Sequence, residues 1–107
     1  MNLSLQQFEE AMSKQQGHTV ILCHYGSFNH SNVYEKFSME VDELEYEFKD
    51  LIFDNPNLEM ITSTLLKKDI KEITYCWFSN QIQLILCDGN RLSFDLMIEI
   101  EIDIKTT

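Results

Sequence analysis

The sequence predicts an α+β fold: an N-terminal helix packed on a curled antiparallel sheet, a meander of about five to seven strands that is either open or a partly closed barrel. Three observations predict this fold. A capping signal with an apolar stripe opens the chain, strand-sized apolar stretches follow between turn residues, and a long alternating segment closes it. A chain of 107 residues with three glycines and one proline has room for one core, so we expect a single domain over residues 1–107.

The predicted helix spans residues 4–16. Ser4 and Gln7 have the spacing of a capping box, in which each side chain accepts a hydrogen bond from the other residue's backbone N–H. Leu3 and Phe8 stand at the positions of a hydrophobic staple around that box. A glycine follows the segment, as is common where a helix ends.

Two strands are expected next. Residues 18–25 are apolar and β-branched, which predicts a strand buried on both faces. Within residues 33–41, apolar side chains share one parity, which predicts a second strand paired with the first.

Residues 42–54 fit either a helix or a strand. Their apolar residues form a helical stripe and glutamate suits a helix, yet glutamates also alternate with apolar residues as in a half-buried strand. We favour the strand, because the turn residues 54–57 would join it to residues 58–61 in a hairpin.

The C-terminal third predicts a three-stranded meander. Residues 73–78 and 82–87 have strand character, and Asp88-Gly89 is a hairpin signal before the alternating segment 92–104. A straight strand of that length would extend about 44 Å, whereas a typical strand has about 5 or 6 residues. We therefore expect residues 98–104 either to cover the N-terminal helix or to pair with another chain, for instance as a homodimer.

The charge balance indicates which partners to expect. Asp and Glu number 18 against 8 Lys and Arg, for a net charge of -10. Such a field disfavours direct binding to nucleic acid or to a membrane and favours a basic surface on another protein. No apolar run has the length of a membrane helix, and the N-terminus lacks the pattern of a signal peptide, so we expect a cytoplasmic protein.

The sequence contains no catalytic or cofactor motif, and we expect neither an enzyme nor a bound cofactor. Cys23, His24 and His30 are close in sequence, but zinc-ligand spacing is missing and adjacent strand residues point to opposite faces. We expect Cys23, Cys76 and Cys87 to be buried, reduced and free of metal, because each falls in an apolar strand segment.

The remaining feature is a set of acidic side chains that we expect to bind the partner. As strands, Glu43, Glu45 and Glu47 would form one row about 6.8 Å apart, and Glu99, Glu101 and Asp103 a second. That spacing has the order of magnitude of the phosphate repeat in DNA. The predicted partner-binding residues are Glu40, Asp42, Glu43, Glu45, Glu47, Asp50, Glu99, Glu101 and Asp103.

The sequence therefore predicts a small acidic, non-enzymatic protein-binding module. Its most concrete form is an inhibitor that mimics nucleic acid and occupies a basic nucleic-acid-binding surface, as an anti-CRISPR, anti-restriction or immunity protein of a phage or mobile element would. One alternative is a small ligand-binding domain or enzyme that uses His24 and His30 in a pocket. Another is a structural subunit that dimerises through its C-terminal strand.

Overall fold

The computed structural model describes residues 1–27, 29–51 and 63–101. Within them the chain forms one α-helix and eight strands, so the predicted α+β class is confirmed. In chain order the elements are α1 (Leu5–Ser13), β1 (Val20–Tyr25), β2 (His30–Tyr34), β3 (Phe37–Val41), β4 (Glu45–Asp50), β5 (Ser63–Leu66), the 3-10 helix η2 (Lys67–Asp69), β6 (Ile70–Cys76), β7 (Gln81–Leu86) and β8 (Arg91–Asp95). The described helices include none long and apolar enough to cross a membrane.

The strands form two antiparallel sheets, and the order of their strands is that of a barrel interrupted at two places. One sheet has the order β2-β1-β8-β7-β6 and the other β3-β4-β5. Neighbours in the chain pair with each other except between β2 and β3 and between β5 and β6, and β8 pairs with β1. The strands thus follow one another as in an up-and-down barrel, but the sheet is not closed, because hydrogen bonding stops at those two corners.

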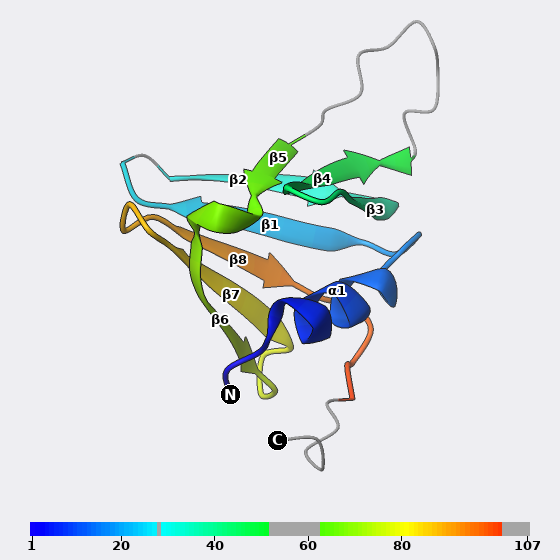
Figure 1. The fold of residues 1–107 in the computed structure, drawn as a ribbon. Helices are drawn as coiled ribbons and strands as arrows, with labels where there is room; N and C mark the ends of the chain where they lie inside the picture. The colour runs from blue at the N-terminus through cyan, green and yellow to red at the C-terminus, as the bar shows by residue number, and fades with distance from the viewer. Residues whose placement is uncertain (28, 52–62, 102–107) are drawn as a thin grey trace, which may run out of the picture.

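The core lies between the two sheets and includes one face of α1 (Figure 1). Phe8 of α1 has its ring centroid 5.4 Å from that of Tyr46 in one sheet and 6.0 Å from that of Phe94 in the other. Phe48 joins Phe94 directly, at 5.3 Å. Since each of these side chains is almost fully buried, the helix and both sheets share a single core.

Helix α1 begins as predicted and ends earlier. Ser4 is the N-cap and forms the full capping box with Gln7, and Leu3 and Phe8 of the predicted staple are both buried. The helix stops at Ser13 rather than at residue 16, and a turn follows in which the buried Gln15 faces the C-terminal segment.

Two predictions about the first strands were wrong. The strand at residues 18–25 is β1, and only alternate side chains such as Val20 and Leu22 are buried, since its second face lies outside the core. The segment 33–41 is divided between two sheets. Val33 in β2 pairs with β1 as expected, whereas Phe37 opens β3 and pairs with β4.

The strand interpretation of residues 42–54 is confirmed for β4, while the predicted turn at 54–57 and the strand at 58–61 lie outside the described residues. The C-terminal meander β6-β7-β8 is confirmed, and Gly89 in its second turn has a φ of 89°. Trp77 and Phe78 fall in the first turn rather than in a strand, and are 70% and 82% exposed.

The final strand is shorter than the alternation predicted. β8 ends at Asp95, and the chain then leaves the sheet towards the end of α1. Leu96 and Ile100 are buried in the protein's own core, and Ile98 bonds to Gln15 in the turn that follows α1, so residues 96–101 pack on the protein itself. Pairing of residues 98–104 with another chain stays a prediction, and residues 102–104 lie outside the described part.

Candidate functional site

The outer face of the three-stranded sheet places several of the predicted acidic residues together. Alternation along β4 turns Tyr46 and Phe48 into the core and leaves Glu45, Glu47 and Lys49 on the outer side. These outer side chains are half-buried among their neighbours rather than fully extended into water. The strand period therefore determines which side chains of this stretch are available to a partner.

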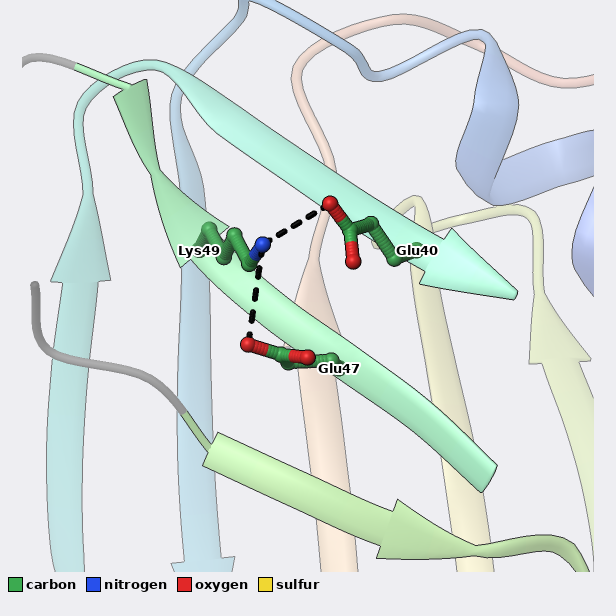
Figure 2. A network of polar contacts seen from close by, with 3 residues as sticks. All are labelled: Glu40, Glu47 and Lys49. Atoms are coloured by element: carbon green, nitrogen blue, oxygen red, sulfur yellow. Dashed lines mark hydrogen bonds and ion pairs between the residues drawn. The ribbon is translucent and has the colours of Figure 1, made fainter. Parts of the chain in front are cut away.

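Two glutamates on this face are direct cross-strand neighbours held by one lysine (Figure 2). Glu40 of β3 is opposite Glu47 of β4, a like-charge pair that by itself would destabilise the sheet. Lys49 Nζ lies 2.8 Å from Glu40 Oε1 and 3.6 Å from Glu47 Oε1, and its hydrogen bond to Glu40 raises the lysine pKa. One cation thus offsets two carboxylates and leaves the face negative.

The adjoining hairpin completes an acidic hollow of about 270 Å³. The hollow is lined by Glu40, Val41, Asp42, Glu45 and Glu47. Asp42 closes the hairpin, since its backbone N–H donates to the carbonyl of Glu45 and its carboxylate accepts from the N–H of Glu43. We call Glu40, Asp42, Glu43, Glu45 and Glu47 together the acidic face.

Exposed apolar side chains border the acidic face. Leu44 at the hairpin tip is 71% exposed and Val41 is 51% exposed. Leu66 of β5 stands opposite Glu45 in the sheet and is also exposed. Large apolar side chains grouped beside a charged hollow are typical of a surface that another macromolecule covers.

The other predicted acidic residues do not belong to this face. Asp50 is 3% exposed, and its two carboxylate oxygens accept the backbone N–H groups of Glu35 and Lys36 at 2.9 and 3.0 Å. It is a structural residue at the corner between β2 and β3, so its prediction as a surface residue was wrong. Glu99 and Glu101 lie beyond the end of β8 and form no strand row, and Asp103 lies outside the described residues.

The structure places some residues of this surface differently from the prediction. Glu43 precedes the first residue of β4, so it extends the acidic hairpin rather than the strand row that the alternation predicted. Leu44 has the parity of Tyr46 and Phe48 and was expected on the core side, but it belongs to the hairpin and is exposed. Lys49 was not predicted as part of this surface, although it stands two residues after Glu47 in the sequence.

The structure also brings His24 and His30 together. They are cross-strand partners in β1 and β2, with ring centroids 5.1 Å apart and planes at 23°. They border a cavity of about 250 Å³ between the two sheets, whose lining is Leu22, His24, His30, Asn32, Phe48, Ser63, Thr64, Leu65, Leu86 and Leu92. The sequence indicated the two histidines as candidates for a pocket, but it did not indicate that β5 forms one wall of this cavity.

The predicted state of the cysteines was wrong in part. Cys76 and Cys87 are exposed, and Cys23 is half-buried on the outer face of β1. Among the described residues, no three His, Cys, Asp or Glu side chains are grouped so that they could hold a metal ion. Comparison of the chain with protein-family models, with curated proteins and with solved structures finds no match.

Proposed function

We propose that this protein is a non-enzymatic binding module whose acidic face docks on a basic surface of a partner protein. The observation that supports it is the acidic hollow itself, in which carboxylates from β3, β4 and their hairpin surround about 270 Å³ with Lys49 as the neighbouring cation. A lysine or arginine side chain of the partner would enter the hollow and pair with Glu45 and Asp42, which have no ion pair within the described residues.

The apolar side chains beside the acidic face would contribute binding affinity that charged side chains alone would not. Charged rims mainly raise the association rate and select the partner, whereas affinity comes from desolvated apolar anchors. Leu44 and Val41 project beside the carboxylates and would bury apolar surface on docking. The most concrete partner is a nucleic-acid-binding protein, since its basic groove already accepts a row of negative charges, and blocking that groove would be inhibition of the anti-CRISPR, anti-restriction or immunity type.

The proposal is tested with the immobilised protein as bait for basic nucleic-acid-binding proteins in a cell lysate. We expect proteins that are retained at low salt, released as salt rises, and displaced by duplex DNA. The bait in which Glu43, Glu45 and Glu47 are all changed to Lys should lose them. The matched control reverses three exposed acidic residues outside the face, Glu10, Glu35 and Glu99.

The two variants have the same charge change, so a loss confined to the first one identifies the acidic face rather than net charge. Circular dichroism checks that both remain folded. Retention by both baits, or capture that DNA does not disturb, would contradict the proposal.

The cavity beside His24 and His30 supports a second candidate function, the binding of a small apolar molecule. Leucine and phenylalanine form half of its lining, and the polar half is the two histidines, Asn32, Ser63 and Thr64. Apolar walls with a few polar groups are typical of ligand sites. A ligand found by NMR screening should shift the ring signals of both histidines, and Leu86→Trp, which fills the cavity, should abolish that binding. Binding that survives the filled cavity would place the ligand elsewhere.

A further inference from the structure

The outer face of the five-stranded sheet is a second surface with a different chemistry. Helix α1 packs on the inner side of this sheet, where its Phe8 ring contacts Phe94. The strand period turns Leu22, Leu84 and Phe94 into the core and leaves the alternate residues of the same strands on this face.

Strand register aligns polar side chains in one row across this face. The row runs from Ser31 through Cys23, Ser93 and Gln83 to Thr74, each opposite the next in the ladder. Cross-strand neighbours of this kind have Cβ atoms about 5 Å apart. Ser93 is only 6% exposed although it lies on the outer side, because longer side chains surround it.

The only arginine in the chain stands beside this row, two residues before Ser93 in β8. Arg91 is opposite Tyr25 in β1 and Ile85 in β7. Lys49 and Lys67 are paired with glutamates, but Arg91 is exposed and has no ion pair among the described residues. Its guanidinium is therefore a charged donor available to a ligand, placed beside an aromatic ring.

A hollow of about 450 Å³ lies beside Arg91 on this face. Its lining is Tyr25, Gly26, Gln81, Gln83, Gly89, Arg91, Leu92 and Ser93. The volume is within the range of about 300–1,000 Å³ that small-molecule sites have.

The rim of the hollow is held by a contact between two turns. Asn90, in the turn before β8, occupies the space where any side chain at Gly26 would begin. Its Oδ1 also accepts the backbone N–H of Ser27 at 3.3 Å, and Asp88 in turn accepts its N–H groups. The rim is therefore formed before a ligand arrives, which lowers the entropic cost of binding.

We infer that this hollow binds a small organic carboxylate. The Arg91 guanidinium has the planar fork that matches a carboxylate, Ser93 and Gln83 offer further hydrogen bonds, and the Tyr25 ring is a flat apolar surface for the body of the ligand. A singly charged ligand fits better than a phosphate dianion. One cation faces the hollow, and Asp95, hydrogen-bonded to Gln81, stands in the neighbouring row.

The site is tested by NMR titration of the whole protein with benzoate, using benzamide, its uncharged isostere, as the control ligand at equal ionic strength. We expect benzoate to produce saturable shifts of the amide signals of Tyr25, Gln83, Arg91 and Ser93, and benzamide to produce none. Arg91→Gln should weaken benzoate binding at least about tenfold, and Arg91→Lys should be intermediate, since it keeps the charge and loses the fork.

Lys71→Gln, which removes an exposed charge from β6 of the same sheet, should leave benzoate binding unchanged. Three results would overturn the inference: no saturable shift at these amides with benzoate, equal shifts with benzamide, or unchanged benzoate binding in Arg91→Gln. The variant in which Glu43, Glu45 and Glu47 are all changed to Lys should bind benzoate normally, which separates this site from the acidic face.

Discussion

Asp50 illustrates at the scale of a residue how a carboxylate in an acidic stretch can be structural. It lies at the end of β4 and faces inward, where it accepts two backbone N–H groups from the turn between β2 and β3. Those groups belong to Glu35 and Lys36, the residues at which the chain passes from one sheet to the other. The Asp50 side chain thus stabilises a corner that the two sheets cannot bridge with ladder hydrogen bonds.

We predict that Asp50→Ala lowers the free energy of unfolding by about 2–4 kcal/mol, because two backbone donors lose a charged acceptor in a buried setting. Asp50→Asn should lower the free energy of unfolding by less, since its amide oxygen still accepts one of these hydrogen bonds. Glu43→Ala, at an exposed position before the other end of β4, is the control and should change stability by less than about 0.5 kcal/mol. Urea unfolding measures all three, and equal stability of Asp50→Ala and Glu43→Ala would refute the structural role.

The exposed cysteines lead to a second prediction at this scale. Hydrogen bonds from Ser79 lower the pKa of the Cys76 thiol. Cys76 should therefore react with a thiol reagent at neutral pH faster than Cys87, and both faster than the half-buried Cys23. Ser79→Ala should lower the labelling rate of Cys76 and leave the rates of Cys23 and Cys87 unchanged. The rates are measured by mass spectrometry of peptides from briefly labelled native protein. Labelling in the opposite order would show that the Ser79 hydrogen bonds do not activate the thiol.

At the scale of an element, the segment after β8 is anchored to the end of α1. The Gln15 amide donates to the carbonyl of Ile98 at 2.8 Å and accepts the Ile98 N–H at 3.1 Å, so one buried side chain replaces a ladder partner. Leu96 N–H bonds to the carbonyl of Asn80, and Ile100 is 8% exposed. These contacts make residues 96–101 part of the fold.

We therefore predict that truncation after Met97 destabilises the monomer. The loss of the buried Ile100 and of the Gln15 pair should lower the free energy of unfolding by about 3 kcal/mol. Met97→Ala, at a position that is 66% exposed, is the control and should melt like the parent. A parent that sediments as a dimer and becomes an equally stable monomer on truncation would instead support pairing between chains.

At the scale of the whole molecule, three buried tyrosines make the stability of the fold depend on pH. Tyr34, Tyr46 and Tyr75 are 1%, 0% and 8% exposed, and they belong to β2, β4 and β6. Burial is the main cause that raises the pKa of each phenol, and the hydrogen bond from Tyr46 to Glu9 raises that of Tyr46 further. Both sheets thus contain phenols that are more easily ionised in the unfolded chain than in the folded one.

The sign of the pH dependence follows from these shifts. Above pH 10, near the ordinary tyrosine pKa, the unfolded chain loses protons that the folded state retains, so stability falls as pH rises. We predict that each tyrosine lowers the stability by at most about 1.4 kcal/mol per pH unit between pH 10 and its own raised pKa, with little contribution below pH 10. Urea unfolding at several alkaline pH values measures it. Tyr46→Phe should reduce the slope, and a slope unchanged by that substitution would contradict the assignment.

The sequence by itself determined the elements whose causes are local. The capping box of Ser4 and Gln7 joins residues three apart, and the turn at Asp88-Gly89 sets the geometry of its own hairpin. Alternation likewise predicted β4 and the meander β6-β7-β8. The acidic residues that came together as a site, Glu40 to Glu47, do so because β3, β4 and their hairpin are adjacent in the chain.

Only the tertiary structure decided which other segment of the chain each strand contacts. Alternation separates two faces of a strand, but it does not say which sheet the strand joins, so the change of sheet between Tyr34 and Phe37 was not foreseen. Nor does it say where a ladder ends, and β8 stops at Asp95 because Gln15, distant in sequence, takes over the hydrogen bonds of Ile98. Contacts between residues far apart in the chain also set the position of Arg91 beside Tyr25, and no local pattern encodes that pairing.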